Sequence, residues 1–151
     1  MKEIESFIDH LECPLINGIV FPDRTIQLFE IEVSWENPVE FKLQASSVTS
    51  IDNFEKEGEL SWCSCAILNQ YVDKTGSIKA FCGEGSYGSD GFVCVMNLER
   101  EKVIWIAYFT SSNPFHKVTI KEGQVIAIST LDCIWKFNLD MPSVIEVMSH
   151  L

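Results

Sequence analysis

The chain opens with apolar residues at helical spacing. They are Ile4, Phe7, Ile8 and Leu11. A spacing of three or four residues is typical of the buried face of an amphipathic helix. We expect this helix to stop at Cys13-Pro14, because the residue before a proline is pushed out of helical geometry. The pattern therefore predicts one short N-terminal helix.

After this segment the apolar positions change to a period of two. Every second residue is apolar from Phe29 to Trp35 and again from Val39 to Leu43, and Glu36-Asn37-Pro38 lies between the two runs. Alternation on both sides of a turn signal predicts a β-hairpin. Pairing across this turn places Val33 opposite Phe41 and puts the polar residues on the other face.

Short runs rich in β-branched and aromatic residues fill the rest of the chain. They are Leu60 to Gln70, Ile78 to Cys82, Phe92 to Leu98, Val103 to Thr110, Val118 to Ile120, Val125 to Leu131, Cys133 to Leu139 and Val144 to Val147. Such runs, separated by turn signals, predict strands. Phe92 to Val95 and Val103 to Phe109 are apolar at successive positions, which predicts strands covered on both faces.

Two local signals complete the predicted elements. One or two helical turns are expected between Ser50 and Gly58, with Gly58 as a left-handed cap. The tight turn Glu122-Gly123 is expected to pair Ile120 with Val125. The predicted fold class is mainly β (α+β): an antiparallel curved sheet or a β-sandwich of short strands, with one layer completed by the N-terminal helix.

Composition indicates that this fold needs no disulfide bonds for stability. The 151 residues, 46% of them hydrophobic, fit a single globular domain over residues 1–151. The N-terminus lacks the apolar stretch of a secretory signal, and the longest apolar run, Val103 to Phe109, is far shorter than the ~20 residues of a spanning helix. We therefore expect a cytoplasmic protein that binds no membrane, with six buried free cysteines rather than three disulfides.

A glycine-rich segment resembles a nucleotide-binding pattern by spacing alone. Gly83 to Gly88 spells G-x-G-x-x-G after the predicted strand that ends at Cys82. A dinucleotide site requires a helix immediately afterwards, but Phe92 to Leu98 is expected to be a strand, and Glu84 would repel phosphate. We interpret Gly83 to Gly91 as an inter-strand loop, and we expect no cofactor.

Metal ligation and catalysis lack a matching pattern. Neither C-x-x-C nor H-x-x-x-H occurs, and the pair Cys63 and Cys65 does not have the usual zinc-site spacing. The chain has three histidines, and His116 with Cys82 or Cys94 is the one nucleophilic pairing left open. We expect neither a metal site nor a catalytic residue.

The distribution of charge is more informative than any motif. Residues 1–60 carry 13 acidic and 4 basic side chains, a net of −9, whereas residues 61–151 carry 9 and 7, a net of −2, and together they give −11. The acids concerned are Glu30, Glu32, Glu36 and Glu40 on the predicted hairpin and Asp52, Glu55, Glu57 and Glu59 after it. A charge of this sign argues against nucleic acid as a partner. It is consistent with general solubility or with a surface that captures a basic protein.

In size, acidity and predicted β content, with the two acidic groups above, the chain resembles the immunity proteins of bacterial contact-dependent and other polymorphic toxin systems. The resemblance implies a non-enzymatic protein that binds and neutralises one cognate toxin, commonly a basic nuclease. An aromatic anchor is expected at such an interface, and Tyr87 in the glycine-rich segment is the candidate. A small-molecule-binding or enzymatic β-domain and an accessory interaction domain remain alternatives.

Overall fold

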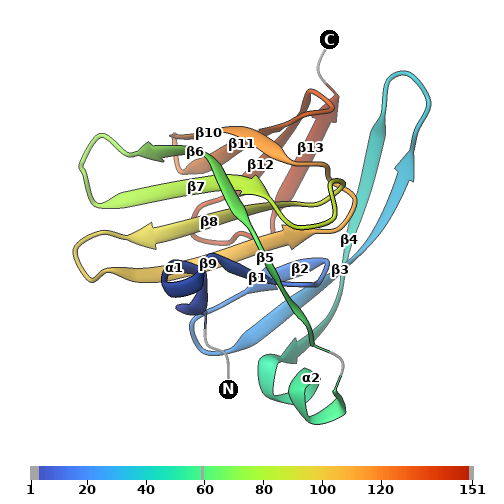
Figure 1. Ribbon diagram of the computed structural model, residues 1–151. Coiled ribbons are helices and arrows are strands. Elements are labelled where there is room, and N and C mark those ends of the chain that lie inside the picture. The colour runs from blue at the N-terminus through green and yellow to red at the C-terminus, as the bar shows by residue number, and fades with distance from the viewer. Residues whose placement is uncertain (1–3, 59, 150–151) are drawn as a thin grey trace.

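A seven-stranded antiparallel sheet forms the middle layer of the computed structural model, which describes residues 4–58 and 60–149 (Figure 1). Its strands, in spatial order, are β4 (Glu40–Ser50), β3 (Thr25–Ser34), β2 (Gly18–Val20), β9 (Lys102–Phe109), β8 (Gly91–Asn97), β7 (Ile78–Glu84) and β6 (Ala66–Val72). One face packs on a four-stranded sheet of β10 (Phe115–Lys121), β11 (Gln124–Ser129), β12 (Cys133–Asn138) and β13 (Ile145–Ser149). The predicted mainly β class with antiparallel packing is confirmed.

The other face of the middle sheet is covered by a two-stranded ribbon and two helices. The ribbon pairs β1 (Glu12–Pro14) with β5 (Trp62–Ser64), and the helices are α1 (Ser6–His10) and α2 (Ile51–Glu57). In Figure 1 the ribbon and α1 lie across the front of β8 and β9. Within the described residues, neither helix is long and apolar enough to cross a bilayer.

Two hydrophobic cores result, one on each face of the middle sheet. Between the two large sheets, aromatic rings fill the interior, and the ring centroids of Phe109 and Trp135 lie 4.9 Å apart. Under the ribbon and α1, the Phe7 ring meets the edge of Phe92 at 5.2 Å. The expectation that Phe92 to Val95 and Val103 to Phe109 are covered on both faces is confirmed, because both segments contribute to both cores.

The predicted registers are confirmed. Val33 pairs with Phe41 in the β3–β4 hairpin, and Ile120 pairs with Val125 across the β10–β11 turn. Both registers follow from the alternation of apolar residues, because a slip by one position would turn each buried face to solvent. The cap at Gly58 is also confirmed, with a left-handed φ of 70° at the end of α2.

Two element boundaries differ from the sequence prediction. Leu60 to Gln70 is two strands in two different sheets, since Cys65 separates β5 from β6. The N-terminal helix ends at His10 rather than at Cys13-Pro14, because Leu11 adopts a left-handed conformation and the chain then enters β1. At Cys65 the chain crosses from the ribbon to the middle sheet, which a periodic pattern does not indicate.

Side chains join the edges of the two large sheets. At one side the Asn69 Oδ1 of β6 accepts a hydrogen bond from the backbone N–H of Val118 in β10, at 3.0 Å. At the other side the Ser149 Oγ of β13 donates to the carbonyl of Val39, just before β4, at 2.6 Å. The tip of the β3–β4 hairpin projects beyond this second junction (Figure 1).

Candidate functional site

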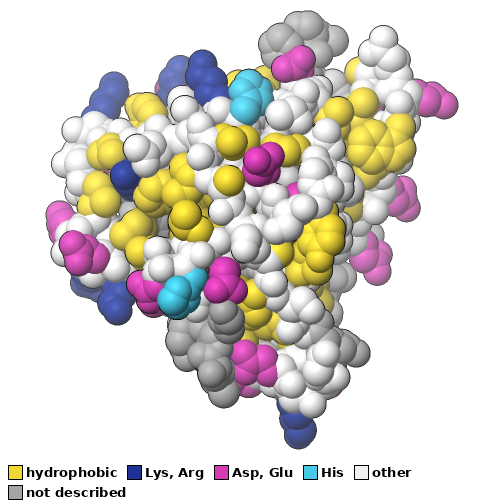
Figure 2. Space-filling view, viewed as in Figure 1, with side chains coloured by type: hydrophobic (Ala, Val, Ile, Leu, Met, Phe, Trp, Pro, Cys, Tyr) yellow, Lys and Arg dark blue, Asp and Glu magenta, His cyan; other side chains and the backbone are white. Residues whose placement is uncertain are grey.

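Four of the predicted partner-binding glutamates come together on the β3–β4 hairpin. Glu30 and Glu32 lie on β3, Glu36 in the turn and Glu40 at the start of β4, and all four are exposed. Figure 2 shows acidic side chains along the side of the molecule that this hairpin forms. Lys42 lies opposite Glu32 in register, but among the described residues no ion pair within 4 Å joins any of the four to a cation. Their negative charge therefore faces solvent uncompensated.

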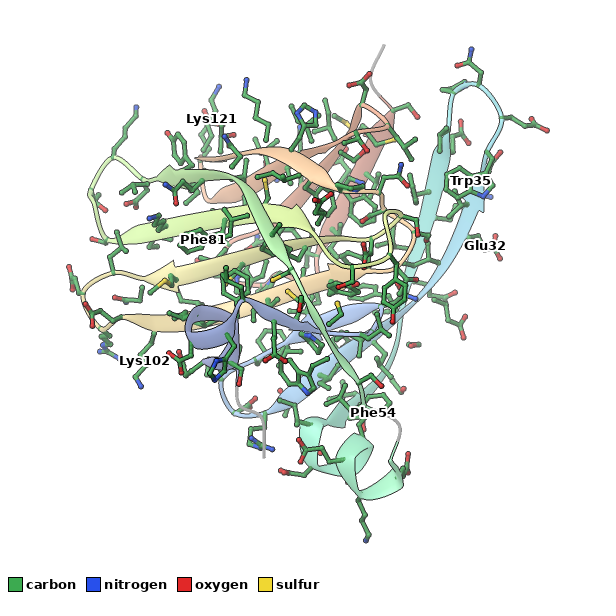
Figure 3. All side chains as sticks on the ribbon, in the orientation of Figure 1. Glu32, Trp35, Phe54, Phe81, Lys102 and Lys121 are labelled. Atoms are coloured by element: carbon green, nitrogen blue, oxygen red, sulfur yellow. The ribbon has the colours of Figure 1, made fainter. Side chains whose placement is uncertain are left out.

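Trp35 belongs to the same hairpin and has 59% of its surface exposed, although strand alternation points it to the opposite face from Glu30, Glu32 and Glu40. The alternation places Trp35 on the apolar face with Val33, and the contact with Phe41 agrees with this, yet most of the indole is exposed. Strand β3 ends at Ser34, and the hairpin tip projects so far that no described element covers the indole (Figure 3). One edge of the ring is still supported by Phe41, whose centroid lies 6.3 Å away at 75°. We call Glu30, Glu32, Trp35, Glu36 and Glu40 the acidic hairpin surface.

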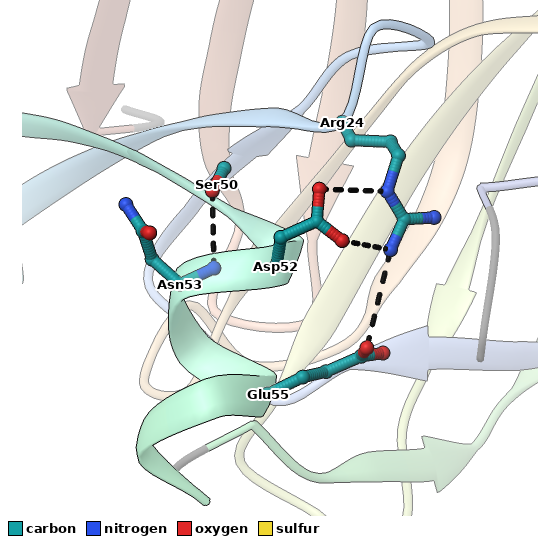
Figure 4. A network of polar contacts seen from close by, with 5 residues as sticks. All are labelled: Arg24, Ser50, Asp52, Asn53 and Glu55. Atoms are coloured by element: carbon teal, nitrogen blue, oxygen red, sulfur yellow. Dashed lines mark hydrogen bonds and ion pairs between the residues drawn. The ribbon is translucent and has the colours of Figure 1, made fainter.

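The second predicted acidic group is organised differently, by α2 and Arg24. Arg24 makes two hydrogen bonds to Asp52, of 2.9 and 3.3 Å, and lies 4.0 Å from Glu55 (Figure 4). One guanidinium thus pairs with both carboxylates, so Arg24 offsets one of their two negative charges within the protein. Glu57 is exposed, whereas Glu59 lies outside the described residues.

The two acidic groups do not form one surface. Strand β4 has eleven residues, with Glu40 at its start and α2 directly after its end, and a strand of that length spans about 35 Å at roughly 3.3 Å per residue. Ser50 ends the strand and caps α2, since its Oγ accepts a hydrogen bond from the Asn53 N–H at 3.1 Å. The hairpin alone thus combines uncompensated charge with an exposed aromatic ring.

The glycine-rich segment is the hairpin connection between β7 and β8, and a strand rather than a helix follows it. Its glycines allow close packing: a Cβ at Gly83 would overlap the Ala66 carbonyl oxygen, and a Cβ at Gly91 would overlap that of Asn113. The loop between the strands is shorter than predicted, because Gly83 and Gly91 belong to the strands. Tyr87 projects from it with 65% of its surface exposed.

A buried polar cluster that the sequence did not indicate lies beside this loop. The Tyr108 hydroxyl of β9 donates a hydrogen bond to Asp90 Oδ2 and lies 3.3 Å from the Cys63 Sγ of β5. Asp90 is only 1% exposed, and its Oδ1 has no hydrogen-bond partner among the described residues. Burial, and then the hydrogen bond to Asp90, raise the pKa of Tyr108 far above its ordinary value. The cluster is enclosed, so it fixes β5 and the glycine-rich loop onto the middle sheet.

Other candidate chemistry is dispersed. All six cysteines are free thiols, five of them buried and Cys65 half-buried. Within residues 4–58 and 60–149, no three side chains of His, Cys, Asp or Glu are grouped to hold a metal ion. His10 and His116 are exposed on separate elements, and His150 lies outside the described residues.

Known proteins do not supply a function. The sequence matches no protein-family model and no curated protein. The resemblance to immunity proteins therefore carries no residue role, and function must be inferred from the surfaces described above.

Proposed function

We propose that the protein is a non-enzymatic inhibitor, of the immunity-protein type, that binds and neutralises a basic toxin through the acidic hairpin surface. The observation that carries this proposal is the exposed Trp35 ring on the same hairpin as four exposed glutamates, none of which is ion-paired within 4 Å to a described cation. Exposed aromatic rings within a charged rim are typical of protein interfaces.

The two components of this surface would serve different steps of binding. The uncompensated glutamates, on a protein of net charge −11, would accelerate encounter with a cationic partner and make the rate dependent on salt. Trp35, already held at one edge by Phe41, would bury its indole in the partner and slow dissociation. The partner that fits is a basic protein with a recess for an aromatic ring, such as a nuclease with its phosphate-binding cleft.

The interior supports this proposal over a small-molecule-binding domain. Aromatic side chains fill the space between the two large sheets, where a β-barrel or sandwich would hold a ligand. For example, the ring centroid of Trp135 lies within 5.5 Å of the centroids of Phe41, Phe109 and Phe115. This packing occupies the space that a ligand would need.

The test is inhibition of a candidate toxin, sought first among proteins encoded beside this one. We expect Trp35→Ala to raise the dissociation constant by at least about 30-fold, as for a hot-spot residue of about 2 kcal/mol. Tyr87→Ala is the matched control, because Tyr87 is equally exposed but belongs to a different hairpin. Equal losses from both substitutions, or a loss from Tyr87→Ala alone, would contradict the assignment of the anchor to the acidic hairpin surface.

A further inference from the structure

Three cysteines lie on one face of the β1–β5 ribbon. Cys13 and Cys63 are direct partners in this antiparallel pair. The pairing continues past β5, since the backbone N–H of Cys65 donates to the Leu11 carbonyl at 2.8 Å. Because side chains alternate along a strand, Cys63 and Cys65 both point to the face that carries Cys13.

This face is the one turned toward the middle sheet, where the core under the ribbon includes a fourth thiol, Cys94 of β8. Cys13, Cys63 and Cys94 are buried, whereas Cys65 is half-buried and therefore reachable from solvent. Burial, and then a hydrogen bond with the Cys65 thiol, raise the pKa of Cys13 well above its ordinary value. Cys65 is thus the thiol that has both access to solvent and a thiol neighbour.

We propose that Cys65 and Cys13 are a peroxide-sensitive modification site that closes to a disulfide. In the first step the Cys65 thiolate attacks a hydroperoxide, the O–O bond breaks, and sulfenic acid and an alcohol or water are formed. In the second step the Cys13 sulfur attacks the Cys65 sulfur, the S–S bond forms, and the hydroxyl leaves as water with the Cys13 proton. The two thiols lose two electrons in total, and the hydroperoxide accepts them.

The surroundings favour Cys13 over Cys63 as the second thiol. The Cys63 Sγ is held by the Tyr108 hydroxyl at 3.3 Å in the buried polar cluster. Cys65 packs against the core that contains Cys13, and such proximity raises the rate of an intramolecular step. Because Cys65 is half-buried whereas Cys13 is buried, peroxide reaches Cys65 first.

The bridge would enclose the segment that carries the acidic hairpin surface. From Cys13 to Cys65 the closed loop has 65 − 13 + 1 = 53 residues, and it contains β2, β3, β4 and α2. A cross-link over a loop of this length restricts the unfolded chain, and for a domain of this size we expect the melting temperature to rise by roughly 10 °C. This inference does not depend on the proposed function.

The experiment treats the reduced full-length protein with hydrogen peroxide and maps its thiols and disulfides by mass spectrometry. Wild type should lose two free thiols, form a Cys13–Cys65 bridge, and show a higher melting temperature that a thiol reductant reverses. Cys65→Ala should form no bridge and show no shift. Cys82→Ala is the matched control, because Cys82 belongs to the core on the other face of the middle sheet, and it should behave like wild type.

Three results would overturn the proposal. They are a Cys13–Cys63 bridge, oxidation of Cys65 to sulfinic acid while Cys13 remains a free thiol, and no change in wild type. The positions of thiols and disulfides in the oxidised wild-type protein distinguish these results from the proposed bridge, even if a variant fails to fold.

Discussion

Replacing Tyr108 by Phe isolates the hydroxyl of the buried polar cluster, because the aromatic ring and its packing are retained. The hydroxyl donates to Asp90 Oδ2 and contacts Cys63 Sγ at 3.3 Å. In the variant the Asp90 side chain stays enclosed, and its Oδ1 already lacks a partner among the described residues. Both carboxyl oxygens would then be buried without a hydrogen bond from a described side chain.

The expected cost is about 3 kcal/mol. A buried acceptor that loses its hydrogen-bond partner costs about 1–3 kcal/mol, and we expect the upper end of this range because both oxygens of one carboxyl group are then unpaired. In a domain of this size a loss of about 3 kcal/mol lowers the melting temperature by about 6–12 °C.

Urea unfolding of wild type, Tyr108→Phe, Asp90→Ala and the double variant measures this cost and its origin. Asp90→Ala removes the oxygens that Tyr108→Phe would leave unpaired, so the tyrosine substitution should cost much less in the Asp90→Ala background. Tyr87→Phe is the control, and its effect should lie within about 0.5 kcal/mol of zero because the ring is exposed. Additive effects, or a Tyr108→Phe cost no larger than that of Tyr87→Phe, would refute the reasoning.

Further predictions concern alkaline pH, a strand crossing and a helix cap. Burial raises the pKa of Cys82 from about 9 to about 12; between these values the unfolded thiol loses its proton while the folded one keeps it, so stability falls with rising pH. Cys82→Ala should flatten that fall by about 1.4 kcal/mol per pH unit in unfolding titrations. Gly83→Ala should prevent the close approach to the Ala66 carbonyl and leave little folded protein by circular dichroism. Ser50→Ala should lower the free energy of unfolding by about 1 kcal/mol, because α2 loses the cap on Asn53, and an unchanged urea midpoint would contradict this.

The local pattern of apolar and turn residues predicted which strands pair, but it did not predict which layer each strand belongs to. The registers of Val33 with Phe41 and Ile120 with Val125 follow from alternation and turn residues alone. Nothing in the periodicity of Leu60 to Gln70 indicates that the chain leaves the ribbon at Cys65 and enters the middle sheet. That crossing is set by contacts with segments distant in sequence.

For the candidate site, too, the sequence predicted local features but not those that depend on distant segments. The glutamates of the hairpin were found from sequence because they alternate with apolar residues. Trp35 follows the same alternation as Val33, yet it is exposed because the hairpin projects beyond the four-stranded sheet. The pairing of Arg24 with Asp52 joins residues 28 positions apart, so the sequence alone did not reveal that a cation offsets part of the second acidic group.

The most direct test of the acidic hairpin surface is the association rate with the isolated basic partner, measured across ionic strength. Reversal of Glu30, Glu36 and Glu40 to Lys changes the net charge from −11 to −5, since each reversal adds two. The same reversal at the exposed acids Glu99, Glu122 and Asp140 is the matched control. We predict that the hairpin variant associates at least about tenfold more slowly at low salt and shows a flattened salt dependence, whereas the control stays much closer to wild type. Equal slowing in the two variants would show that net charge, and not this surface, governs the encounter.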